Sequence, residues 1–187
     1  EVLDGPQRLD DLLALATRLE GHPDNAAASL LGGLVVSAVA RDGGVSALAT
    51  PWPSHLALVF ARPRATLDTR RARAAVPDTV SRADAVFNLQ RAPLFVQSIA
   101  TGDTRFLREA TRDRLHQPYR LALVPGLEQA LALEHPSLCG VFLSGAGPAV
   151  GAIVTGDPTP VIALLEGVYR GIGLDADVGA IGVEQPF

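Results

Sequence analysis

Apolar residues recur along this chain with two different periods, and each period predicts one kind of element. Helical spacing is clearest over 10–20, where Asp10 is the expected cap, over 79–102, and over 159–170. A short helix is expected over 25–31. Two runs with caps or breakers around them predict further helices, from Asp103 to about 114 and over 125–135, and the run 66–75 before Pro77 predicts another.

Shorter apolar runs predict strands. The runs 34–40 and 45–49 flank Arg41-Asp-Gly-Gly44, which is typical of a hairpin turn. Other strands are expected over 56–61, 141–143, 150–154 and 176–183. Strands separated by helices, with adjacent antiparallel pairs, favour an α+β sandwich over a doubly wound sheet. Pro51-Trp-Pro53 interrupts regular structure, so we expect one domain over 1–53 and another over 54–187.

Composition narrows the function classes. A length of 187 residues allows a real core, and the net charge of −4 gives no general electrostatic case for nucleic-acid binding. No apolar run approaches the roughly 20 residues of a membrane span, and no signal peptide is evident, so a cytoplasmic protein is predicted. Cys139 is the single cysteine, which excludes an internal disulfide framework and a Cys-rich zinc site.

The most informative segment is Glu20-Gly-His-Pro-Asp-Asn25, followed by Gly32-Gly33 before an apolar strand. Four polar groups lie within six positions here, shaped by Gly and Pro. The tetrapeptide His-Pro-Asp-Asn alone is typical of a plain turn. No second His or Cys lies at ligand spacing from His22, so a transition-metal site is not expected. The longer string is similar to the substrate-site segment of homoserine kinases in the GHMP small-molecule kinase family.

A second segment, Ser144-Gly-Ala-Gly-Pro148, follows a predicted strand. Glycines let backbone N–H groups approach a ligand oxygen closely, although a simple tight turn has the same composition. The segment resembles the third GHMP motif, which implies nucleotide binding by Ser144, Gly145, Ala146 and Gly147.

Two further segments extend the resemblance. Ala72-Arg-Ala-Ala-Val-Pro77 with Asp84-Ala-Val-Phe-Asn88, and Asp113-Arg-Leu-His-Gln-Pro-Tyr-Arg120, are similar to homoserine-kinase patterns. In that family an arginine of each segment contacts the amino-acid substrate, which implies this role for Arg73 and Arg120. A guanidinium can hold a carboxylate through two parallel bonds, which lysine cannot. Arg62, Arg64, Arg70 and Arg71 are interpreted as surface charges.

The resemblance implies an amino-terminal-domain remnant followed by a ferredoxin-like α/β sandwich, and ATP- and Mg²⁺-dependent phosphorylation of the L-homoserine hydroxyl to O-phospho-L-homoserine on the route to threonine. Glu20 and Asp24 are the candidate catalytic carboxylates. Glu20 would be the Mg²⁺ ligand, while Asp24 would bind substrate with His22 and Asn25. No general base is evident.

One large departure qualifies this interpretation. The family's phosphate loop, Pro-x-x-x-Gly-Leu-Gly-Ser-Ser-Ala, is absent, and only 21 residues precede His22. The chain is therefore interpreted as a carboxyl-terminal portion that does not turn over ATP by itself. Its first 50 residues are expected to be mobile or covered by another copy, which leaves a homodimer open. A different GHMP kinase, or a folded fragment without activity, are the alternatives.

Overall fold

The computed structural model describes residues 9–65 and 67–186, which form two compact units. The first unit runs to Trp52 and also includes the tail from Val183 onward. The second unit is Pro53–Gly182. None of the helices in the described ranges is both long and apolar enough to cross a membrane.

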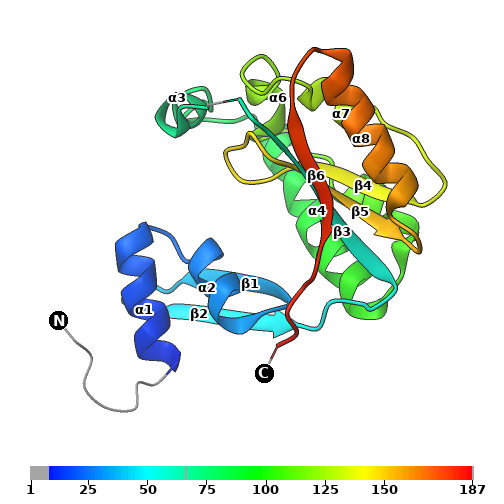
Figure 1. Cartoon of the computed structure of the whole chain (residues 1–187). Helices are drawn as coiled ribbons and strands as arrows, with labels where there is room; N and C mark the ends of the chain where they lie inside the picture. The colour runs from blue at the N-terminus through cyan, green and yellow to red at the C-terminus, as the bar shows by residue number, and fades with distance from the viewer. Residues whose placement is uncertain (1–8, 66, 187) are drawn as a thin grey trace. The chain divides into compact units, whose positions relative to one another are not determined.

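The first unit packs two helices on a hairpin (Figure 1). The helices are α1 (Leu9–Glu20) and α2 (Asp24–Leu31), and the antiparallel strands are β1 (Leu34–Val39) and β2 (Val45–Thr50). Leu13, Ala26 and Ala27 form the buried centre, against which one face of the hairpin packs. The hairpin is confirmed. The expected cap is wrong, because α1 begins at Leu9 and Asp10 lies in its first turn.

The other face of the hairpin is covered by no described part of its own unit. Val36 pairs with Leu48 across the strands, and 49% and 78% of these two residues is exposed. Side chains along a strand alternate between its two faces. The same pleat therefore exposes this surface and partly buries Val35 and Ala47 on the inner face.

The chain's tail packs on the first unit at Gly32 and Gly33. The N–H of Gly33 donates to the carbonyl of Glu184 at 2.6 Å. A Cβ on Gly33 would lie 2.4 Å from the carbonyl oxygen of Thr50, and one on Gly32 would lie 2.8 Å from that of Gln185. Both glycines also have positive φ, so this close backbone approach requires them.

The second unit is built on a four-stranded antiparallel sheet in the order β4-β5-β3-β6 (Figure 1). The strands are β3 (Leu56–Pro63), β4 (Leu138–Leu143), β5 (Val150–Thr155) and β6 (Ala176–Ile181). The two long helices, α4 (Arg82–Thr101) and α8 (Thr159–Gly171), make the chain order β-α-β-β-α-β. This order and topology are those of a ferredoxin-like split βαβ fold, as the resemblance to GHMP kinases implies.

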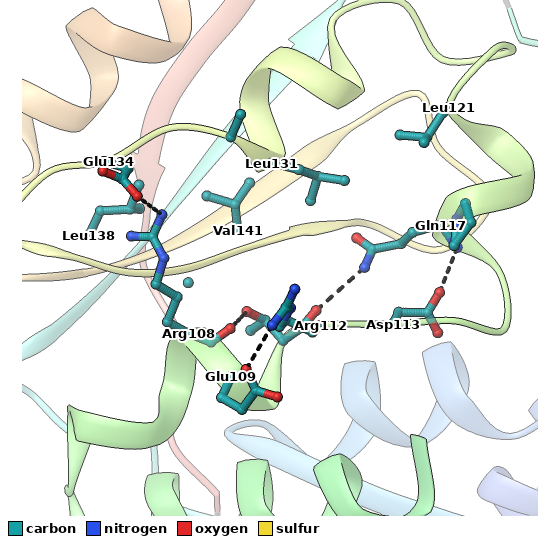
Figure 2. A pocket seen from close by; sticks show the side chains of 14 residues that line it. Arg108, Glu109, Arg112, Asp113, Gln117, Leu121, Leu131, Glu134, Leu138 and Val141 are labelled. Carbon is teal, nitrogen blue, oxygen red and sulfur yellow. Dashed lines mark hydrogen bonds and ion pairs between the residues drawn. The ribbon is translucent and has the colours of Figure 1, made fainter. Parts of the chain in front are cut away.

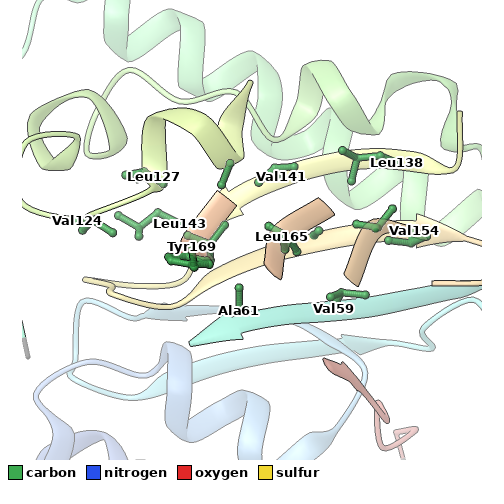
Figure 3. Close-up of a cluster of buried hydrophobic side chains, with 14 residues drawn as sticks. Val59, Ala61, Val124, Leu127, Leu138, Val141, Leu143, Val154, Leu165 and Tyr169 are labelled. Atoms are coloured by element: carbon green, nitrogen blue, oxygen red, sulfur yellow. The ribbon is translucent and has the colours of Figure 1, made fainter. Parts of the chain in front are cut away.

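The main core lies on one face of this sheet (Figure 3). Val59, Ala61 and Val154 point from the strands toward Leu165 and Tyr169 of α8. On the opposite face, Ile153 is also fully buried. The Phe60 and Phe142 rings on that face meet edge to face at 6.2 Å. Strand β5 is therefore buried on both sides.

Several predicted helices are shorter in the structure. The helix expected over 66–75 is α3 (Thr69–Ala74), and residue 66 lies outside the described ranges. The helix expected from Asp103 is a 3₁₀ turn (Thr104–Phe106) followed by α5 (Leu107–Ala110). The helix expected over 125–135 is α7 (Leu127–Leu131) because Gly126, at φ 79°, breaks the helical backbone before it. The periodicity gave no sign of α6 (Gln117–Arg120).

Candidate functional site

The first candidate segment is the turn between α1 and α2. Gly21 has φ 84°, which allows the sharp turn after Glu20. His22 Nδ1 lies 2.5 Å from Asp24 Oδ1, and the same oxygen accepts the N–H of Asn25 at 2.8 Å. Burial raises the pKa of Asp24, but the Asn25 N–H and His22 outweigh it and hold the pKa below 3.8. The carboxylate therefore stays charged at neutral pH and orients His22.

Glu20 and Asn25 line one small hollow between α1 and α2, with a volume of about 310 Å³. Both residues are exposed. The turn thus brings these two predicted residues to a common surface, while Asp24 and His22 form their own pair beside it.

The second unit brings α3 and α6 together through Arg120. This arginine is only 8% exposed, and its Nε donates to the carbonyl of Ala72 at 3.0 Å. The neighbouring Arg73 is exposed. Among the described residues, no carboxylate forms an ion pair with Arg120, although buried charges are normally paired. The two arginines predicted to hold a carboxylate thus belong to segments that are in direct contact.

The other two predicted segments interlock as well. Asn88 on α4 donates from Nδ2 to Asp113 Oδ1 at 2.6 Å and accepts the N–H of Arg114 at 2.9 Å. Asp84, one turn earlier on α4, lies 3.6 Å from the Arg114 guanidinium. The guanidinium carbon of Arg114 is also 4.0 Å from the ring centre of Phe87. These contacts join α4 to the segment that carries Arg120.

The glycine loop after β4 is held at its two ends. Ser144 N–H donates to Ala149 O, and Gly147 N–H donates to Ser144 O, each at 2.9 Å. The amides of Gly145 and Ala146 donate to no other described residue. Gly145, at φ 56°, has open space where a Cβ would stand, whereas Gly147 packs against Leu143 and Val124. The loop therefore has two adjacent N–H groups without an acceptor among the described residues, next to open space at Gly145.

A pocket of about 660 Å³ lies beside the outer edge of β4 (Figure 2). Asp113 and Gln117 stand at one end, and Arg108 with Glu134 stands at the other. Arg108 donates to the carbonyl of Leu133 at 2.8 Å and lies 3.6 Å from Glu134. The pocket's charged groups therefore compensate one another, and of the predicted site residues none lines it.

Comparison with known proteins shows which proteins this chain resembles. Residues 95–168 match the family model described as GHMP kinases C terminal. Homoserine kinase from Solibacter usitatus (strain Ellin6076) is 44% identical over 170 residues, which cover 91% of this chain and 56% of that protein. Homoserine kinase from Gloeobacter violaceus (strain ATCC 29082 / PCC 7421) is 47% identical over 153 residues, or 81% and 50% of the two chains. Over residues 95–168 the chain is therefore similar to the carboxyl-terminal part of GHMP kinases.

The chain spans about half the length of the curated relatives that it matches. A solved homoserine kinase from Cytophaga hutchinsonii ATCC 33406 superposes with a TM-score of 0.88 at 24% identity, over 98% of this chain and 61% of that one. The superposition shows that the two share a fold.

The GHMP kinases use ATP, and two features of this chain bear on how it would hold ATP and a metal ion. The Gly145 and Ala146 amides suit phosphate oxygens, because backbone N–H groups in a glycine turn form an anion-binding concavity. Among the described residues no group of three or more His, Cys, Asp or Glu side chains could hold a metal ion. Glu20 therefore fits only the kind of Mg²⁺ site in which phosphates supply most of the ligands.

Sequence reasoning overlooked Asp113 and Gln117 as site residues. Gln117 is 5% exposed, and its Oε1 accepts the N–H of Leu143, the last residue before the glycine loop, at 2.8 Å. Both residues stand inside the quoted segment Asp113 to Arg120, so the signal was present. Only the fold shows what they contact.

Proposed function

We propose that this chain supplies part of a homoserine kinase, which transfers the γ-phosphoryl group of ATP to the hydroxyl of L-homoserine in threonine biosynthesis. One observation carries the proposal. Arg120 is buried, yet no described carboxylate pairs with it. A substrate carboxylate would supply the missing partner, and the 39–47% identity to three homoserine kinases supports homoserine as its source.

In the second unit, Arg120 and Arg73 would hold the carboxylate of homoserine. The Ala72 carbonyl already fixes the Nε side of the Arg120 guanidinium, so its remaining nitrogens would face the ligand. The Ser144–Gly147 turn would direct the Gly145 and Ala146 amides at phosphate oxygens. Both sets of donors are in place before the ligand arrives, which lowers the cost of orienting it.

Asn25, Asp24 and His22 lie in the first unit, where Asn25 and Asp24 would bind a polar group of a ligand and His22 would orient Asp24. Glu20 would be a ligand of Mg²⁺, and bound Mg²⁺ neutralises charge on the phosphates in enzymes of this kind. Asp24 cannot serve easily as a strong base because its pKa is lowered, so its role is to bind.

Calorimetric titration of the purified chain with L-homoserine tests the proposal. Arg120→Ala and Arg73→Ala should each weaken binding about ten- to a hundredfold, the size expected for one charge-assisted contact. Arg120→Lys keeps the charge but loses the planar fork, so it should also bind weakly. Arg62→Ala, which removes an exposed arginine paired with Asp177, is the matched control and should leave affinity within about twofold.

A second ligand separates recognition of the carboxylate from general effects. Homoserinol, in which an alcohol replaces the carboxylate, should bind the parent chain and Arg120→Ala equally weakly. If L-homoserine does not bind the parent chain, or binds Arg120→Ala as tightly, the assignment is wrong. Calorimetric titration with mevalonate in parallel tests the other GHMP substrate class.

A further inference from the structure

The Asp113 carboxylate is the most heavily hydrogen-bonded group near the proposed substrate site. Its Oδ2 accepts the N–H groups of Gln117 at 2.6 Å and His116 at 2.8 Å. Its Oδ1 accepts the N–H of Leu115 at 3.1 Å and the side-chain amide of Asn88 at 2.6 Å. Only 8% of this side chain is exposed.

These bonds fix a helix that would not form alone. Helix α6 has four residues, and its N-cap residue, His116, gives no side-chain cap. An isolated helix shorter than about 12 residues is marginal in water, so tertiary contacts must hold α6 in place. Asp113 supplies the missing cap from outside the helix, and Asn88 anchors that cap to α4.

Helix α6 in turn carries two groups that reach the proposed ligand contacts. Arg120, its last residue, bonds the carbonyl of Ala72 on α3. Gln117, its first residue, bonds the N–H of Leu143 at the entrance of the glycine loop. A shift of α6 would therefore move the guanidinium and the loop entrance together.

We propose that Asp113 is a positioning residue, which with Asn88 sets the place of Arg120 and so determines affinity for the carboxylate of the substrate. This inference rests on the proposed function only in naming that carboxylate as homoserine's. Asp113 acts through α6 and does not itself touch the substrate.

The surrounding charges agree with this role. Burial lowers the pKa of His116 below 6.5 and the nearby Arg120 lowers it further, against the opposing effect of Asp113. His116 is thus neutral at pH 7, and Arg120 faces no cationic imidazole. Arg114, the other nearby cation, is engaged by Asp84 and Phe87.

Asp113→Asn is the first test variant. It keeps the shape but replaces an acceptor by a donor that faces N–H groups. L-homoserine affinity should fall about tenfold. Asn88→Ala removes the bond to Asp113 and the acceptor of the Arg114 N–H but leaves the backbone donors of α6 capped by Asp113, so it should lower the affinity about threefold. Asp103→Asn is the matched control, because Asp103 caps the 3₁₀ turn through Arg105 N–H at 3.1 Å without touching α6. It should leave affinity within about twofold.

A double-mutant cycle separates positioning from general destabilisation. If Asp113 acts through Arg120, adding Asp113→Asn to Arg120→Ala should not weaken homoserine binding further. Effects that add in the double variant would overturn the proposal, as would a homoserine affinity unchanged in Asp113→Asn. If that variant does not fold, Asn88→Ala is used in the same cycle.

A spectroscopic readout needs no substrate. The Arg120 Nε–H resonance, which reports the bond to Ala72, should shift in Asp113→Asn and stay unchanged in Asp103→Asn. An unmoved resonance would contradict the positioning role. If the parent chain binds no homoserine but the resonance shifts, the proposed function fails while the positioning of Arg120 stands.

Discussion

Strands β2 and β5 have the same length but are buried in opposite ways. In β2, residues 45–48 alternate between half-buried and exposed, and among the described strands only β1 pairs with it. In β5, residues 150–154 are all buried, and β4 and β3 flank the strand. The difference teaches that a strand's sequence reflects how many layers cover it: Val-Ser-Ala-Leu-Ala-Thr has a polar residue every few positions, while Val-Gly-Ala-Ile-Val is continuously apolar.

The comparison extends to the stability of the two units. The second unit buries a large side-chain core between sheet and helices, whereas the centre of the first consists of one leucine and two alanines. The outer face of the hairpin contributes little to the stability of the described chain, so perturbations of equal chemistry should have unequal effects in the two units.

Hydrogen exchange should show the largest contrast. Amides of β5 should open only with global unfolding, which in domains of this kind costs about 5–15 kcal/mol, while those of β1 and β2 should exchange through local opening at much lower cost. Exchange followed by mass spectrometry measures both. Uniformly strong protection across residues 9–50 in a monomer would contradict the comparison.

A matched pair of leucines gives the next largest effect. Leu165 is fully buried in the core of the second unit, whereas Leu48 is 78% exposed on the hairpin. Leu165→Ala should lower the free energy of unfolding by about 2–5 kcal/mol because it leaves a cavity. Leu48→Ala should change it by less than about 0.5 kcal/mol. Urea denaturation checks both, and a cost at Leu48 that grows with protein concentration would indicate a second copy on that face.

A pair of glycines tests packing at equal backbone strain. Gly126 and Gly43 have φ of 79° and 84°, but a Cβ on Gly126 would lie 2.9 Å from the Tyr169 ring, while one on Gly43 meets open space. Gly43→Ala should lower the free energy of unfolding by about 1–2 kcal/mol because of backbone strain alone. Gly126→Ala should cost about 1–3 kcal/mol more, because the buried ring must move. Equal melting temperatures for the two variants would refute this.

Asp113 and Asp24 give the smallest expected difference in stability between the two units, and the one that depends most on pH. Burial raises the pKa of Asp113, but N–H donors of Gln117 and His116 and the Asn88 amide outweigh it, so the folded-state pKa lies below 3.8. A carboxylate whose pKa is lowered in the folded state stabilises that state above pH about 3.8. This contribution is lost as the pH falls through the folded-state pKa. Asp113→Asn should lower the free energy of unfolding by about 1–3 kcal/mol at pH 7. It should also reduce the loss of stability that the parent chain shows as the pH falls toward 3.

Asp24 provides the counterpart in the first unit. Its pKa is also lowered, but 72% of its side chain is exposed. Asp24→Asn should therefore change the free energy of unfolding by less than about 0.5 kcal/mol at any pH between 3 and 7. Urea denaturation curves measured over this pH range test both variants. If the free energy of unfolding of Asp113→Asn fell more steeply with decreasing pH than that of the parent chain, the lowered pKa of Asp113 would be contradicted.

The long helices and the hairpin could be predicted from sequence, as could the short helix α2, while α6 and the bounds of other short helices could not. Periodic apolar positions predict helices α4 and α8, and the turn residues between two apolar runs predict the hairpin. Helix α6 has four residues, too few for a period to register, and it exists because Asp113 and Asn88 hold it. The helix expected from Asp103 was overextended, since local pattern cannot show that the chain leaves the helix at Thr111 to make the Asp113 cap.

Of the candidate site, residue types and segments were evident from the chain, and contacts were not. The resemblance selected Arg73, Arg120 and the glycine loop, whose roles stay predictions. It did not show that Arg120 is buried against Ala72, or that Asn88 and Asp113 meet from positions 25 residues apart. Such pairings depend on how α4 lies beside the segment after α5.

The sequence by itself determined the α+β class, the resemblance to GHMP kinases and the glycine-rich turns, because periodicity, breakers and contiguous motifs are local properties of the chain. Only the tertiary structure decided which charges are buried, which amides lack partners among the described residues, and that the tail from Val183 returns to Gly32 and Gly33 of the first unit. These properties depend on desolvation and on contacts between residues that are distant in sequence, and both arise only when the chain has folded.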